Sequence, residues 1–237
     1  MRRGPLVSLN GSRSAADGAA VPVSPEELAE SALAAVAAGA GEVLVHPRTP
    51  CGRESLSPRV VGPALEALRA AGLGVPLAVA ASIGSESDPA ARLARVRSWT
   101  VLPDRAAVDF AEPGAGVLAE ALLGRGVAVD AVVRLGGPAG PDPLARFLAW
   151  PVREPRRVRL TAELAAADPG LVAGLRGLPP VEVVLYGREA AAWPVLRLAA
   201  RCGTGVRTGV GDVLRLPDGR PARSNAELVA AATAASR

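Results

Sequence analysis

Lysine is the most informative absence in this chain, because all 27 basic residues are arginine. Without a side-chain primary amine the protein cannot form a lysine Schiff base, which excludes pyridoxal phosphate enzymes and lysine-dependent aldolases. A standard P-loop is excluded too, since its lysine contacts the nucleotide phosphates.

Aromatic residues are also scarce, at 3% of the chain, and the net charge is only +4. The arginines are scattered among acidic residues. The sequence therefore shows neither a continuous basic patch nor aromatic side chains on which bases could stack. We expect no nucleic-acid partner.

Cysteines and long apolar runs are scarce as well. Cys51 and Cys202 lie far apart and have no CxxC spacing. Neither a disulfide framework nor a zinc finger is indicated, and a reducing cytoplasm suits such a chain. Polar residues interrupt the first twenty positions, and no run of about 18 apolar residues follows. We expect a cytoplasmic protein that does not enter a membrane.

What the sequence does contain is a recurring signal for the start of a helix. A capping residue followed directly by proline marks such a start, because proline at the first helical position loses no hydrogen bond. A serine three residues before a glutamate has the spacing of a capping box. The signals are Ser24-Pro25, Ser57-Pro58, Asp88-Pro89, Glu112-Pro113, Asp142-Pro143 and Asp168-Pro169, the boxes at Ser24 with Glu27 and Ser224 with Glu227, and a further helix is expected over 189–201.

Short apolar or β-branched runs precede these helices, at residues 5–10, 42–47, 76–82, 106–110, 127–133, 158–161, 181–186 and 206–210. Their continuous apolar character suits strands that are covered on both faces. Strict alternation of strands and helices predicts an α/β protein, a somewhat shortened (β/α)8 barrel in a single domain over residues 1–237. An open doubly wound sheet is the alternative, but no GxGxxG follows the first run. The fifth unit, 133–157, is rich in glycine, proline and arginine, so its helix should be short.

In a barrel of this kind the site lies where the strands end. Several arginines and carboxylates fall at those positions, which indicates an anionic ligand held by guanidinium groups. The alternative is that these charges pair as salt bridges on a solvated rim. Arginines within 153–159, which lead into the sixth strand, are expected to form a solvated face at the opposite end. The candidate substrate contacts are Asn10, Arg48, Ser82 and Asp109, and the other positions at the mouth are Arg13, His46, Glu112, Arg134, Thr161, Glu163, Tyr186, Arg188, Glu189, Arg207 and Asp212.

His46 is the only histidine in the chain and follows a short apolar run. A histidine in this place either ligates a metal or is a satisfied residue of the core, and a single imidazole does not make a metal site. Cys51 lies five residues further on, but no neighbouring base is evident that would activate it as a nucleophile.

Several segments carry a resemblance to a known family, in a specific order and over nearly the whole chain. They are Ser8-Leu9-Asn10-Gly11, Val23-Ser24-Pro25-Glu26-Glu27-Leu28, Val45-His46-Pro47-Arg48, Gly52-Arg53-Glu54-Ser55-Leu56, Arg97-Ser98-Trp99, Leu102-Pro103-Asp104, Ala192-Trp193-Pro194-Val195-Leu196, Leu216-Pro217-Asp218-Gly219-Arg220-Pro221 and Asn225-Ala226-Glu227-Leu228-Val229. With these segments the chain resembles the β-keto acid cleavage enzymes, the relatives of 3-keto-5-aminohexanoate cleavage enzyme. The resemblance implies a zinc-dependent (β/α)8 barrel, in agreement with the count of strands.

The resemblance also implies a reaction. A β-keto acid and acetyl-CoA would give acetoacetate and a new CoA thioester, with zinc polarising the keto group. Arg207 and Asp212 would be the catalytic arginine and aspartate near the end of the eighth strand. The implied partners are a small β-keto acid and CoA, and we expect a homo-oligomer.

The implied metal site departs from the family pattern. The family has His-x-His-Pro-Arg where this chain has Leu44 before His46, and it has a glutamate where this chain has Gly211. His46 is then the one expected zinc ligand that remains, and it would bind weakly unless Asp212 joined it. In addition, Tyr186-Gly187-Arg188 replaces the family's His-Gly-Glu.

Three functions from different classes follow. The chain is a metal-assisted acyltransferase of this family, a catalytically degenerate homologue that binds a keto acid or CoA ester without turnover, or a structural partner of an active paralogue. The retained Arg207 and Asp212 favour the first two, whereas the lost ligands favour the second over the first. The transferase is the leading hypothesis because the family signature runs through the chain, and we expect zinc well below one ion per chain.

Overall fold

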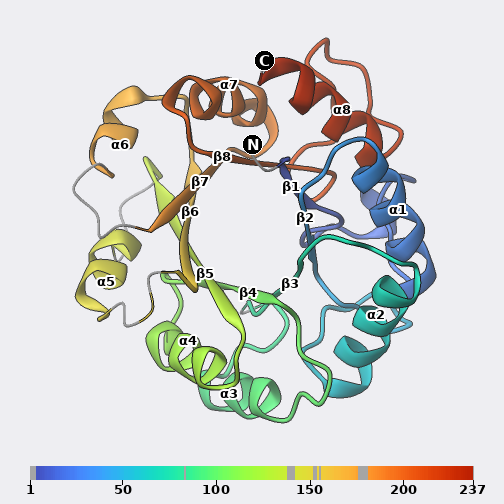
Figure 1. Cartoon of the computed structure of the whole chain (residues 1–237), viewed down its shortest axis with the longest axis vertical. Coiled ribbons are helices and arrows are strands. Elements are labelled where there is room, and N and C mark those ends of the chain that lie inside the picture. The colour runs from blue at the N-terminus through green and yellow to red at the C-terminus, as the bar shows by residue number, and fades with distance from the viewer. Residues whose placement is uncertain are drawn as a thin grey trace.

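The computed structural model describes residues 4–82, 84–137, 142–151, 154, 156–175 and 181–236. Parallel strands close into a barrel in sequence order, with β8 pairing back to β1, and the helices surround the ring (Figure 1). The predicted (β/α)8 barrel is confirmed. The strands are β1 (Leu6–Ser8), β2 (Glu42–Val45), β3 (Leu77–Ala80), β4 (Arg105–Asp109), β5 (Ala128–Leu135), β6 (Val158–Leu164), β7 (Glu182–Tyr186) and β8 (Gly205–Thr208).

The cap-proline signals locate five helix starts correctly, and the capping box at Ser24 and Glu27 forms as expected. The helix of the fifth unit is short, as predicted, and so is the helix of the sixth. The helices are α1 (Pro25–Ala37), α2 (Pro58–Ala70), α3 (Pro89–Arg97), α4 (Ala115–Gly124), α5 (Pro143–Ala149), α6 (Pro169–Ala173), α7 (Ala192–Cys202) and α8 (Asn225–Ala235), with single 3-10 turns at η1 (Ala15–Asp17) and η2 (Glu189–Ala191).

One predicted helix start is wrong. Glu112-Pro113 does not begin a helix, because α4 starts at Ala115 after Gly114 in the left-handed conformation. The physical reason is that the Glu112 carboxylate is buried and accepts a hydrogen bond from Arg92 at 2.8 Å. The N-cap of α4 is Gly114 instead, which has no side chain to cap the first turn.

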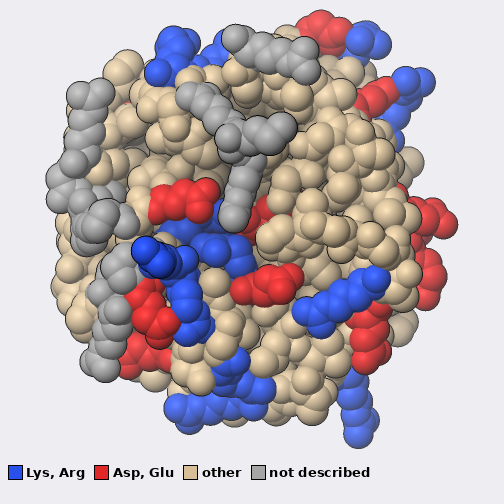
Figure 2. Space-filling model, in the orientation of Figure 1, with Lys and Arg blue, Asp and Glu red and all other residues tan. Residues whose placement is uncertain are grey.

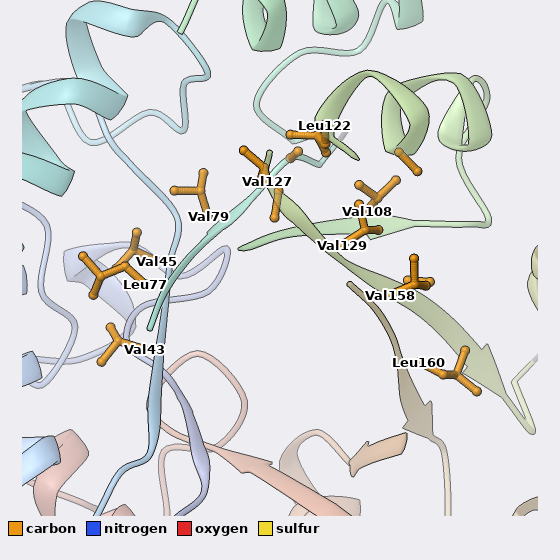
Figure 3. Packing of buried hydrophobic residues seen from close by; sticks show 14 of the residues in the cluster. Val43, Val45, Leu77, Val79, Val108, Leu122, Val127, Val129, Val158 and Leu160 are labelled. Atoms are coloured by element: carbon orange, nitrogen blue, oxygen red, sulfur yellow. The ribbon is translucent and has the colours of Figure 1, made fainter. Parts of the chain in front are cut away.

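Alternation along the strands separates two apolar layers. In β2, Val43 and Val45 belong to the cluster that lies between the strands and the helices, where Figure 3 shows them beside Leu77 and Val79 of β3. Leu44 belongs to a separate small cluster inside the barrel, with Ala78 and other apolar residues. The side chain at position 44 is therefore part of the barrel's interior packing.

A network of charges fills the barrel where the strands begin. Arg159 donates to both oxygens of Glu42, each at 2.8 Å, and also to Asp130. Arg105 donates to the other oxygen of Asp130 at 2.7 Å. Figure 2 shows acidic and basic side chains next to one another near the middle of this face. Since each buried carboxylate has a guanidinium partner, the cost of taking these charges out of water is offset.

The expectation of a solvated face over 153–159 is wrong for its last arginine. Arg159 lies within β6 and is only 3% exposed, because its side chain points into the barrel towards carboxylates of two other strands. Arg156 is exposed, as expected, and Arg153 lies outside the described residues. In the part of the chain that the structure describes, no helix has the length and apolar character needed to span a bilayer.

Replacing Arg159 with alanine should lower the free energy of unfolding by about 3 to 5 kcal/mol, since Glu42 and Asp130 would lose their shared partner inside the barrel. Urea denaturation would measure this. Arg156→Ala is the matched control and should change stability by less than about 0.5 kcal/mol. Equal stabilities of the two variants would show that the network does not hold the barrel together.

Candidate functional site at the carboxyl ends of the strands

A cavity of about 100 Å³ opens where the strands end. A larger cavity, about 570 Å³, lies at the opposite end, where Gly4, Glu42 and Arg159 line it. We place the candidate site in the smaller one, because chemistry in this fold is carried out at the carboxyl ends of the strands. It is lined by Gly11, Ser12, Leu44, His46, Ala80, Ser82, Ala107, Asp109, Glu112, Val132, Arg134, Glu163, Tyr186, Arg188 and Arg207.

Arg207 and Asp212 form a buried ion pair beside this cavity. Arg207 donates from Nε to one Asp212 oxygen at 2.9 Å and from Nη2 to the other at 2.6 Å. Its guanidinium also lies 4.0 Å from the centre of the Tyr186 ring. Burial disfavours the charge on Arg207, but Asp212, Tyr186 and Glu163 together outweigh burial, so the pKa of Arg207 is raised. The guanidinium is thus charged and fixed in orientation.

A chain of polar contacts runs along the next strands. Tyr186 donates its hydroxyl proton to Glu163 at 2.7 Å, and burial raises the pKa of Tyr186. Arg134 approaches Glu163 at 3.8 Å and pairs with Asp109 at 2.5 Å. The predicted substrate contact Asp109 therefore lines the cavity, but a guanidinium already holds its carboxylate.

His46 stands at the end of β2 with only 8% of its surface exposed. Burial lowers its pKa to about 3, and the positive charges of Arg207, Arg48 and Arg188 act in the same direction. The imidazole is therefore neutral at physiological pH. Its Nδ1 is buried and has no hydrogen-bond partner among the described residues. Because the ring lines the cavity, Nε2 is the nitrogen left to meet a ligand.

Two of the predicted substrate contacts bind the protein's own backbone. The Asn10 amide accepts from the His46 backbone nitrogen at 3.0 Å and donates to the His46 carbonyl oxygen at 3.0 Å. Arg48 donates to the carbonyl oxygens of Gly11 at 2.7 Å and Gly52 at 2.8 Å. Neither side chain lines the cavity. Asn10 holds the histidine in place, and Arg48 ties the loop after β2 to the loop after β1.

Ser82 is the remaining predicted substrate contact, and it does line the cavity. Its hydroxyl donates to Glu54 at 3.4 Å, which is a long and weak hydrogen bond. This leaves the hydroxyl free to turn towards a ligand.

The residues present do not fit a three-ligand zinc site. At one of the two other positions, Leu44 packs inside the barrel. At the other, Gly211 lies against Gly11, and a Cβ on Gly211 would come within 2.7 Å of the Gly11 nitrogen and 2.4 Å of the Ser8 hydroxyl. A glutamate there would force the two loops apart. Within the described ranges, no three His, Cys, Asp or Glu residues gather as metal ligands would.

Arg188, which the sequence analysis placed at the mouth without a role of its own, lines the cavity. It follows β7 and donates from Nη2 to the carbonyl oxygen of Gly211 at 3.2 Å. Its guanidinium therefore lies beside the closed ligand position. The signal in the sequence was the motif Tyr186-Gly187-Arg188, in which a basic residue stands where the family has an acidic one.

Comparisons with solved structures give the same fold at low sequence identity. ObcA in a ternary complex with a C4-CoA adduct and oxalate has a TM-score of 0.65 and 16% identity over 89% of this chain and 62% of that chain. Apo ObcA has a TM-score of 0.59 and 16% identity over 89% of this chain and 60% of that one, so this chain spans less than two thirds of ObcA. The 3-dehydroquinate dehydratase from Aquifex aeolicus VF5 has a TM-score of 0.58 and 16% identity over 98% and 97% of the two chains.

No curated protein sequence matches the chain at a significant level. The model of the beta-keto acid cleavage enzyme family does match, over residues 6–133 and 161–237. That match covers every strand except the end of β5 and the beginning of β6. This chain therefore belongs to the beta-keto acid cleavage enzyme family.

Proposed function

We propose that the protein binds a short β-keto acid in the cavity at the strand ends and exchanges its acyl group with acetyl-CoA. The observation that carries this proposal is the buried pair of Arg207 with Asp212. Two hydrogen bonds fix the guanidinium, and its Nη1 has no partner among the described residues, so it can meet a substrate carboxylate. Family membership supports the proposal, as does the oxalate and CoA adduct bound by ObcA.

The size of the cavity limits which β-keto acids can bind. About 100 Å³ is well below the volume of a site for a large organic ligand. An acid of a few carbon atoms suits it, with its carboxylate at Arg207 and its keto group towards His46. The nucleotide part of CoA would then lie outside the cavity, over the rim.

Binding without turnover is the second candidate, and one observation favours it. The contact between Gly11 and Gly211 closes the position from which the family's glutamate would reach a metal. With a single neutral imidazole as a possible ligand, no step of the reaction can be assigned to zinc here, and the chemistry would depend on hydrogen bonds alone.

A reaction with 3-oxopentanoate and acetyl-CoA distinguishes the two candidates. Transfer breaks the bond between C2 and C3 of the keto acid and joins the two-carbon fragment to the acetyl group. The products are propionyl-CoA and acetoacetate, which mass spectrometry detects. Binding by calorimetry with propionyl-CoA formation supports the transferase, and binding without it supports the second candidate. If 3-oxopentanoate does not bind, both candidates are wrong.

Arg207→Lys should weaken acetoacetate binding by about 10-fold. Arginine can bind Asp212 with two nitrogens and offer the third to the ligand, whereas lysine has a single nitrogen. Calorimetry at constant ionic strength would measure the change. Arg220→Lys is the matched control, since Arg220 also pairs with an aspartate but its side chain is 74% exposed. Equal binding by both variants would make Arg207 a structural ion pair only.

Acetoacetate affinity should change by less than about 2-fold between about pH 5.5 and 8.5, because His46, with a pKa of about 3, stays neutral and Arg207 stays charged over this range. If the pKa of His46 were instead near the usual value of about 6.5, the imidazole would gain a positive charge as the pH falls. Anion binding would then tighten. A titration of affinity against pH would reveal this. Tightening below about pH 6.5 that disappears in His46→Gln would contradict the burial argument.

A further inference from the structure

Arg188 differs from the other arginines of the cavity in its partners. Arg134 pairs with Asp109, and Arg207 pairs with Asp212. Arg188 has no carboxylate partner in the described part of the chain, and its contact there is with the carbonyl oxygen of Gly211. Its charge is therefore not neutralised locally, although it lines the same cavity.

The position of this charge is unfavourable for a metal and favourable for an anion. Arg188 lies beside Gly211, where the family pattern has a metal-binding glutamate, and it lines the same cavity as His46. A guanidinium this close repels a dication. It attracts the oxygens of a bound acid and can donate two hydrogen bonds to them.

The imidazole of His46 also favours an anionic ligand over a metal. Its Nδ1 is buried without a partner, and an unpaired lone pair costs less than an unpaired N–H group, so the proton belongs on Nε2. Since the ring lines the cavity, His46 presents an N–H donor to a ligand there. A metal would instead need a lone pair at this nitrogen.

We propose that Arg188 and His46 together hold the keto oxygen of the bound acid, so that a guanidinium replaces the metal ion and the site works without zinc. This inference rests on the proposed function, because it takes the ligand to be a β-keto acid with its carboxylate at Arg207. The inference assigns the keto oxygen to Arg188 and the carboxylate to Arg207. A ligand that has the carboxylate but lacks the keto oxygen therefore separates the two roles.

Calorimetry with acetoacetate and butyrate tests this division. The two acids have the same chain length and the same carboxylate, but butyrate lacks the keto oxygen. Arg188→Gln should weaken acetoacetate binding by about 10-fold and butyrate binding by less than about 2-fold. Arg207→Lys should weaken both. Arg188→Lys should recover part of the acetoacetate affinity, because it restores the charge without the fork.

Arg215→Gln is the matched control for Arg188→Gln. Like Arg188, Arg215 is exposed and donates to a glycine carbonyl oxygen, that of Gly219 at 2.9 Å, but it lies outside the cavity. Its replacement should leave the affinity for both acids unchanged. Circular dichroism of each variant would confirm that the barrel is intact.

Zinc gives an independent readout. Elemental analysis of the purified protein should find far less than one zinc per chain, and acetoacetate affinity should be the same with and without EDTA. Stoichiometric zinc, or loss of binding with EDTA, would overturn the inference and leave the proposed function standing. Equal losses of acetoacetate and butyrate in Arg188→Gln would also overturn it, by placing Arg188 at the carboxylate. If the unmodified protein binds neither acid, both proposals fail.

Discussion

The pairing of β8 with β1 is the contact on which the candidate site depends. Leu6 aligns with Arg207 in this pairing, so the two ends of the chain close the barrel. Loops more than 190 residues apart in sequence then meet, and Gly11 packs against Gly211 with no room for a side chain on either. Asn225 ties the same loops together, since it donates to the Leu9 carbonyl oxygen at 2.9 Å and accepts from the Val210 backbone nitrogen at 2.8 Å. Without closure there would be neither a cavity nor a fixed guanidinium beside it.

The two ends of the barrel differ in how their charged side chains are paired. Where the strands begin, Glu42 and Asp130 are balanced by Arg105 and Arg159 inside the ring, which is a structural arrangement. Where the strands end, Arg188 has no carboxylate partner in the described ranges. A charge that the protein does not neutralise is available to a ligand, and this distinguishes the end at which we propose binding from the opposite end.

Family membership and local geometry inform different questions, the first about the class of protein and the second about the details of this site. The match over most of the chain shows that the protein belongs to the beta-keto acid cleavage enzyme family. The geometry bears on the metal site that the resemblance implies, because one of the implied ligand positions is apolar interior and the other is closed by backbone contact. Replacing a metal ion by a guanidinium keeps a positive charge near the substrate oxygen, but a guanidinium polarises a carbonyl group less strongly.

The sequence by itself determined the alternation of strands and helices, because proline after a capping residue, apolar runs and capping boxes act over a few neighbouring residues. It also placed His46, Ser82, Asp109 and Arg207 at strand ends, where they line the cavity. Only the tertiary structure decided which polar side chains face a ligand and which serve the backbone: Asn10 and Arg48 bind neighbouring loops, and Arg159 turned out to be part of a buried network. The physical reason is that hydrogen bonds and ion pairs form between residues far apart in the chain. These interactions form only when barrel closure brings the residues within about 3 Å of one another.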